Sequence, residues 1–132
     1  MIYQYTIKTD RKIMFYNIDE SLHEAVIKSD VQNGIAVVFV PHTTAGITIN
    51  ENGDPDVLED LSNAAETYFP NLSSFKHFEG NSTAHFNSTV TGASETIIID
   101  KGAPILGRWQ SIYFAEFDGP RTRHYYIKIL EG

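Results

Sequence analysis

The residues of this chain that are best suited to chemistry are histidines outside the apolar periodic segments. His42, His77 and His85 lie in polar stretches or beside the ends of apolar ones. Neutral imidazole is the commonest nitrogen ligand of zinc, and three histidines with an open fourth position are typical of a catalytic metal site. No two of them have the i, i+4 spacing of a helical metal motif, so folding must bring them together. Two interpretations stay open, a metal site or hydrogen-bonded structural histidines.

A carboxylate in an apolar strand is the second candidate. Residues 109–117 are predicted to form a strand, and its alternation puts Glu116 on the same face as Ile112 and Phe114. A carboxylate among apolar side chains is costly unless it is paired, bound to a cation or protonated. Glu116 is therefore a candidate functional residue. The alternative is that the strand ends earlier and Glu116 is solvated at its rim.

Arg121 and Arg123 form the third candidate, at the start of a predicted last strand. As alternate residues they can place two guanidinium groups on one face, an arrangement suited to phosphate, sulfate or carboxylate. The alternative is an edge strand whose charges prevent pairing with another chain. This pair predicts an anionic ligand if both side chains face the same cleft.

Positioning these residues requires strands, and apolar alternation predicts several. Strands are predicted at residues 2–8, 13–18, 34–40, 46–50, 96–99, 109–117 and 123–130. The polar turn at residues 9–12 is expected to join the first two as a hairpin. Residues 34–40 are apolar on both faces, which is typical of a central strand covered on both sides.

An amphipathic stripe predicts a first helix from Asp19. Ser21 and Glu24 have the spacing of a capping box, and Gly34 is a suitable stop. His23 falls among the solvent-facing residues of this helix. We interpret it as a surface histidine.

A second helix is predicted with clear boundaries. Asp54 is expected to cap it, Pro55 to occupy its first turn, and Pro70 to follow its end. Residues 71–83 then form a loop longer than most connections, which is typical of functional segments. Residues 84–94 are ambiguous between strand and helix, and we favour a short helix.

Composition limits the possible classes of protein. The chain has 132 residues, of which 42% are hydrophobic, and this predicts one folded domain over residues 1–132. A net charge of −7 argues against a nucleic-acid partner. The absence of cysteine means that any metal must be held by nitrogen and oxygen. No secretion signal and no apolar run of membrane-spanning length is found, so we expect a cytoplasmic protein with no membrane partner.

Taken together, the motifs of this chain resemble the YjbQ-like family, and the resemblance covers essentially the whole chain. The motifs that carry it are HTTAGITINENGDPD at 42–56, EGNSTAH at 79–85, SETIIIDKG at 94–102 and LGRWQ at 106–110. The resemblance implies a small α+β protein with a compact, two-sheet, β-sandwich-like core that is mostly antiparallel. Two main helices are expected to pack on one side, and the assembly is expected to be a homotrimer.

The resemblance also implies site residues and an activity. His42 and His85 match the motif histidines, as does His77, which precedes a loop of variable length among relatives. Glu116 matches the glutamate after the tryptophan strand, and Arg123 a basic position in the final strand. With the resemblance added, we expect a divalent metal, zinc by preference, at the three histidines. Some family members are described as secondary thiamine-phosphate synthases.

These observations lead to a functional hypothesis and to one alternative hypothesis. The hypothesis is a metal-binding, enzyme-like protein in which the cation and Arg123 orient a small phosphorylated or anionic substrate. Glu116 then serves as general base or as an orienting residue. The alternative hypothesis is a non-catalytic trimeric module that binds a metal or an anion. Arg108 stands where relatives usually carry threonine, so substrate preference can differ here if Arg108 lines the cleft.

Overall fold

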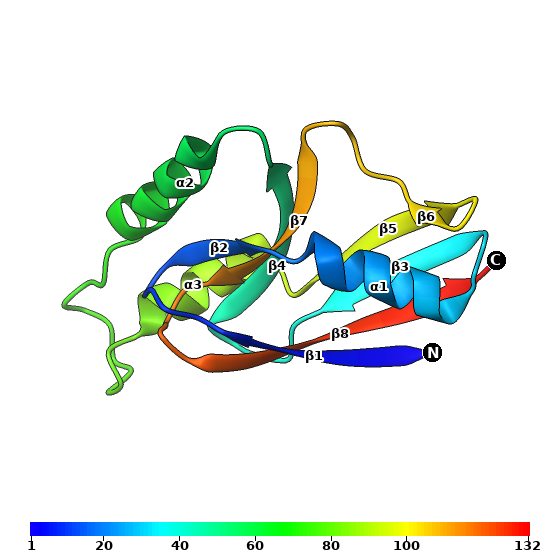
Figure 1. Ribbon diagram of the computed structural model, residues 1–132. Helices are drawn as coiled ribbons and strands as arrows, with labels where there is room; N and C mark the ends of the chain where they lie inside the picture. Colours follow the sequence, from blue (N-terminus) through cyan, green and yellow to red (C-terminus); the bar gives the residue numbers. More distant parts are fainter.

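The computed structural model describes residues 1–132 and has an α+β architecture with two antiparallel sheets and three helices (Figure 1). The larger sheet has the order β1 (Ile2–Lys8), β8 (Thr122–Glu131), β3 (Gly34–Phe39), β5 (Ser94–Asp100), β6 (Ala103–Pro104). The smaller sheet has the order β2 (Met14–Asn17), β7 (Gln110–Glu116), β4 (Ala45–Glu51). The helices are α1 (Asp19–Ser29), α2 (Pro55–Tyr68) and α3 (Ser82–Thr91). The prediction of a mixed α+β fold with two packed, antiparallel sheets is confirmed.

Strand β7 is the central element of the core, because both of its faces are buried. On one face, Ile112 and Phe114 join a cluster shared by α1 and the inner face of the larger sheet. On the other face, Tyr113 and Ala115 join a smaller cluster with residues of α2 and α3. The alternation predicted for residues 109–117 therefore holds, with an apolar layer on each side.

The predicted hairpin of the first two strands is wrong. Strand β1 pairs with β8, whereas β2 pairs with β7 in the other sheet. The inward residues of β1 pack on the larger cluster, and Phe15 of β2 belongs to the smaller one. A polar turn at residues 9–12 allows the chain to change direction, but the burial of each strand's apolar face selects its partner.

Local signals at the helices were partly confirmed. Asp54 caps α2 by accepting a hydrogen bond from the backbone of Asp56, and residues 82–91 form the favoured short helix. The expected capping box in α1 is wrong, because no side chain caps this helix and the Ser21 hydroxyl bonds to that of Tyr125. Gly34 does not stop α1 either. The helix ends at Ser29, with Asp30 in the left-handed conformation.

One face of the larger sheet is uncovered. Residues 34–40 were expected to be covered on both sides, but only Ala36, Val38 and Val40 are buried. Phe39 projects from the opposite face and is 44% exposed, and Ile98 on the neighbouring strand β5 is 60% exposed. The apolar character of β3 on both faces is therefore not explained by packing within one chain.

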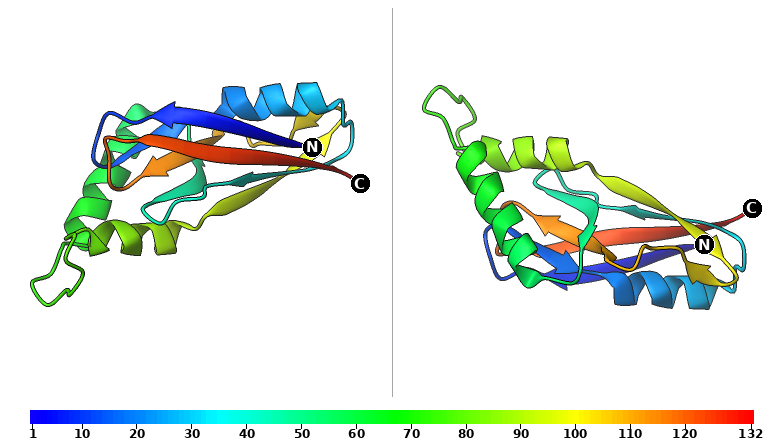
Figure 2. Two further views of the ribbon diagram at one scale, coloured as in Figure 1. Left: turned by 90° about the horizontal axis from the view of Figure 1, so that it is seen from below. Right: turned by 90° about the horizontal axis from the view of Figure 1, so that it is seen from above.

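The loop between α2 and α3 lies at the end of the molecule opposite both termini (Figures 1 and 2). Helix α1 lies toward the end that holds the termini, whereas α2 and α3 lie toward the loop. None of the three helices combines the length and apolar character that crossing a bilayer would need. The histidines and arginines singled out in the sequence gather where this loop meets the starts of β4 and β8.

Candidate functional site

A polar cleft of about 390 Å³ brings the predicted histidines and arginines together. No apolar side chain lines it apart from the proline ring, so its surface consists of donors, acceptors and charges. The lining residues are Pro41, His42, Thr43, Thr44, His77, Glu79, Asn81, His85, Arg121 and Arg123. His42, His77 and His85 therefore line one cleft, although they are distant in the sequence.

Three segments supply the cleft. His42 follows β3 and precedes β4, His85 lies in the first turns of α3, and His77 lies in the loop before α3. Arg121 precedes β8 and Arg123 is its second residue. These positions lie in loops or near the ends of elements, where side chains can converge without displacing the apolar core.

Arg123 and Glu116 form a buried ion pair behind the cleft. Glu116 is fully buried and Arg123 is 4% exposed. The guanidinium donates from Nε to both carboxylate oxygens, at 2.9 and 3.1 Å, and from Nη2 to Oε2 at 2.5 Å. Thr9 donates to Oε1 at 2.7 Å, and the backbone of Asp118 donates to Oε2 at 3.2 Å. Glu116 is therefore a paired core carboxylate and is not solvated at a rim.

The remaining nitrogen of Arg123 is available to the cleft. Nη2 also donates to the carbonyl and hydroxyl oxygens of Thr44, at 3.2 and 2.8 Å. Nη1 has no hydrogen-bond partner in the protein, and it is not fully buried. Since Arg123 lines the cleft, we infer that Nη1 faces it, from a guanidinium whose Nε and Nη2 are hydrogen-bonded to Glu116 and Thr44.

Arg121 is arranged differently from Arg123. It is exposed, and it donates to the carbonyl and the carboxylate of Asp118 at 2.7 and 2.8 Å. Strand β8 lies between β1 and β3, so the interpretation of these arginines as guards of an edge strand is wrong. Both arginines line the cleft, and each is already paired with a carboxylate.

His42 is half-buried, and its orientation is set by the neighbouring strand. Its Nε2 accepts a hydrogen bond of 3.0 Å from the backbone N–H of His124. Burial lowers the pKa of His42, and the positive charge of Arg123 lowers it further, while Glu116 opposes this shift. The neutral imidazole is therefore favoured.

The other two histidines lie together on the loop side of the cleft. The rings of His77 and His85 are nearly perpendicular, with centroids 5.5 Å apart, and His77 Nε2 lies 3.7 Å from the Glu79 carboxylate. No three histidine or carboxylate side chains lie close enough to hold a metal together. In His42 the Nε2 lone pair is already used by a backbone donor. The three predicted ligands thus share a cleft but do not form a coordination shell in this arrangement.

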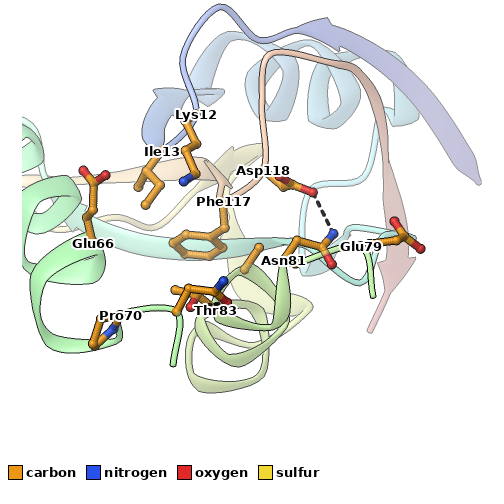
Figure 3. Close-up of a pocket in the computed structure, with 12 residues that line it drawn as sticks. Lys12, Ile13, Glu66, Pro70, Glu79, Asn81, Thr83, Phe117 and Asp118 are labelled. Atoms are coloured by element: carbon orange, nitrogen blue, oxygen red, sulfur yellow. Dashed lines mark hydrogen bonds between the residues drawn. The ribbon is translucent and has the colours of Figure 1, made fainter. Parts of the chain in front are cut away.

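A second pocket of about 340 Å³ adjoins the cleft and shares Glu79 and Asn81 with it (Figure 3). Asn81 donates from Nδ2 to the Asp118 carboxylate at 2.9 Å. Lys12 and Glu66 also line this pocket, and Phe117 forms part of its wall. The bond between Asn81 and Asp118 ties the start of α3 to the corner before β8, and so connects two of the segments that supply the cleft.

Sequence reasoning missed the residues that support the site. Thr9 holds the ion pair from another segment, and Asp118 anchors both Arg121 and Asn81. A threonine in a polar turn and an aspartate before Gly-Pro are typical of turns, so no local signal distinguished them. Arg108 is exposed, lies over the Trp109 ring at 5.1 Å, and does not line the cleft.

Comparison with known proteins gives a consistent result over the whole chain. Residues 3–132 match the family model described as UPF0047 protein YjbQ-like. The chain is 51% identical over 130 residues to a UPF0047 protein of Methanocaldococcus jannaschii, covering 98% of this chain and 94% of that one. It is 44% identical to the UPF0047 protein YugU of Bacillus subtilis, covering 94% and 95% of the two chains.

Solved structures support the same relationship. An uncharacterised conserved protein of Clostridium acetobutylicum superposes with a TM-score of 0.95 at 49% identity, covering 97% of this chain and 99% of that one. A protein of unknown function from Sulfolobus solfataricus superposes with a TM-score of 0.95 at 31% identity, covering 100% and 97%. These descriptions name no activity, so the function must be argued from the cleft.

Proposed function

The chain belongs to the YjbQ-like UPF0047 family, and we propose that it is an enzyme that binds a small phosphorylated or otherwise anionic substrate in the polar cleft. The observation that carries this proposal is Arg123. A buried guanidinium with two nitrogens bonded to Glu116 and Thr44 and the third open to a cleft is suited to oxyanion recognition.

Within this proposal Glu116 positions Arg123. Both of its carboxylate oxygens accept hydrogen bonds from protein donors, and the side chain is fully buried. A general base needs an oxygen within hydrogen-bond reach of the substrate proton. Of the two roles considered for Glu116, the geometry therefore favours orientation over proton abstraction.

The candidate reaction is a transfer of the thiamine-phosphate synthase type. The bond between the pyrimidine methylene carbon and the diphosphate oxygen breaks, and the thiazole nitrogen bonds to that carbon. Negative charge develops on the departing diphosphate, and donors aimed at its oxygens lower the barrier. Arg123 Nη1 and the cleft histidines are donors of this kind.

Zinc binding stays a separate proposal. The rings of His77 and His85 are adjacent, Glu79 lies beside His77, and these residue types suit zinc. We expect elemental analysis of protein purified without chelator to find zinc, and His85→Ala to lose it. Retention of the full metal content by His85→Ala would show that zinc binds elsewhere.

A homotrimer is likewise proposed, because the outer face of the larger sheet is uncovered. Phe39, Ile98 and Leu130 are exposed there, on three adjacent strands. Exposed apolar patches of this kind mark interaction sites. We expect light scattering to give the mass of three chains and Ile98→Lys to lower it, whereas Ile27→Lys, a change at an exposed isoleucine on α1, should leave it unchanged.

Turnover tests the enzymatic proposal. The purified protein is incubated with hydroxymethylpyrimidine diphosphate and thiazole phosphate, beside the variants His85→Ala and His23→Ala. His23 is exposed on α1 and outside the cleft, so it controls for the loss of a histidine. We expect product from the wild type and from His23→Ala, and little from His85→Ala. Rates in all three that do not exceed the rate without protein would favour the non-catalytic binding module.

A further inference from the structure

The hydrogen bond to His42 determines which of its ring nitrogens carries the proton. A backbone N–H can only donate, so the Nε2 atom that receives it from His124 must be unprotonated. In a neutral imidazole the proton then resides on Nδ1. Nδ1 makes no hydrogen bond to the protein, and it is not fully buried. It is therefore the nitrogen of His42 that is available to the cleft.

This tautomer removes three roles from His42. A metal ligand must offer a lone pair, but the pair on Nε2 is used by His124 and Nδ1 carries a proton. A general base also needs a lone pair. A general acid would have to leave an imidazolate anion behind. Donation of a hydrogen bond from Nδ1–H is the role that remains.

The charges around the cleft make a neutral donor useful. Arg123 is paired with Glu116, and Arg121 with Asp118, so both guanidinium charges are compensated by carboxylates. An anion in this cleft is therefore held by directed hydrogen bonds more than by net positive charge. Under these conditions each additional donor contributes directly to affinity.

We propose that His42 is a neutral hydrogen-bond donor that binds an oxyanion through Nδ1–H together with Arg123 Nη1, and that it is not a metal ligand. This assignment rests on the proposed binding of an anionic substrate in the cleft. It divides the cleft into an oxyanion side, formed by His42 and Arg123, and a separate side formed by His77 and His85. The ligand class is a phosphate or a similar tetrahedral oxyanion.

The tautomer is tested directly by nitrogen NMR of protein labelled with ¹⁵N-histidine. The His42 resonances are identified by their absence from His42→Asn. We expect the shift of an unprotonated nitrogen at Nε2 and of a protonated nitrogen at Nδ1. Addition of inorganic phosphate should then shift Nδ1 and leave Nε2 unprotonated. A proton on Nε2 would overturn the proposal.

Two substitutions separate hydrogen-bond donation from metal binding. Asparagine can place its amide nitrogen near the position of Nδ1, whereas leucine has a similar size and no donor. Loss of a hydrogen bond to a charged group should weaken phosphate binding about tenfold or more in His42→Leu. His42→Asn should recover most of the affinity. Chemical-shift dispersion of each variant establishes that it is folded.

Zinc titration completes the test. We expect His42→Leu to bind Zn²⁺ as the wild type does, and His85→Ala to bind it more weakly. Equal loss of Zn²⁺ in His42→Leu and His85→Ala would overturn the proposal, as would phosphate binding that is equally weak in the asparagine and leucine variants. A wild type that binds no phosphate refutes the anionic substrate itself, whereas the tautomer and zinc measurements need no anion.

Discussion

Replacement of Glu116 by leucine leaves Arg123 as an uncompensated charge in the core. Glu116 is fully buried and Arg123 is 4% exposed, so water cannot replace the lost carboxylate. Removal of one partner of a buried ion pair costs about 3–5 kcal/mol. The Thr9 hydroxyl also loses its acceptor at 2.7 Å, but it can still donate to the Arg121 carbonyl oxygen at 3.1 Å, so this loss adds less than about 1 kcal/mol. Domains of this size are stable by about 5–15 kcal/mol, so Glu116→Leu should remove a fifth or more of the total.

Urea unfolding measures this loss. With a slope of about 1–3 kcal/mol per molar urea, a loss of about 3–5 kcal/mol should lower the midpoint by about 1–5 M. The matched control is Glu59→Leu, because Glu59 also forms a two-bond pair with an arginine, Arg11, but on the surface. Its midpoint should change far less, since exposed pairs are solvated and screened.

A double variant identifies the cause. Glu116→Leu with Arg123→Met removes both charges, so it should be more stable than Glu116→Leu alone. The ion-pair explanation is refuted if Glu116→Leu lowers the midpoint no more than Glu59→Leu. It is also refuted if removal of Arg123 from the Glu116→Leu protein gives no recovery.

Three further predictions concern other parts of the chain. Gly34→Ala should lower the melting temperature markedly, because an added Cβ would lie 2.0 Å from the Leu130 carbonyl oxygen; an unchanged value would contradict the β3–β8 pairing. Arg108→Thr should leave phosphate affinity unchanged and alter only Trp109 fluorescence, because Arg108 stacks on that ring outside the cleft. Burial lowers the pKa of His42, so below about pH 6.5 the unfolded chain binds more protons than the folded protein does. The free energy of unfolding should therefore decrease as the pH is lowered through that range. His42→Asn should lack this part of the pH dependence in urea titrations, and identical profiles would refute it.

The local elements of this protein were largely determined by the sequence. Asp54 and Pro55 set the start of α2 through backbone chemistry that needs no distant partner. The alternation of residues 109–117 placed Glu116 among apolar side chains, and the structure confirms that environment. The positions of His42 and His85 in polar segments also identified two residues of the cleft. Each of these inferences depends on neighbours within a few positions along the chain.

Only the tertiary structure decided the strand partners and the chemical state of the site residues. The pairing of β1 with β8, across more than a hundred residues, follows from burial of the apolar face of β1, which a nearby turn cannot specify. Arg121 and Arg123 look equivalent in sequence, yet one is exposed and the other is fixed by Glu116 and Thr44. The protonated nitrogen of His42 is set by a backbone N–H of residue 124. Hydrogen bonds act over about 3 Å, so they depend on contacts that exist only once the chain has folded.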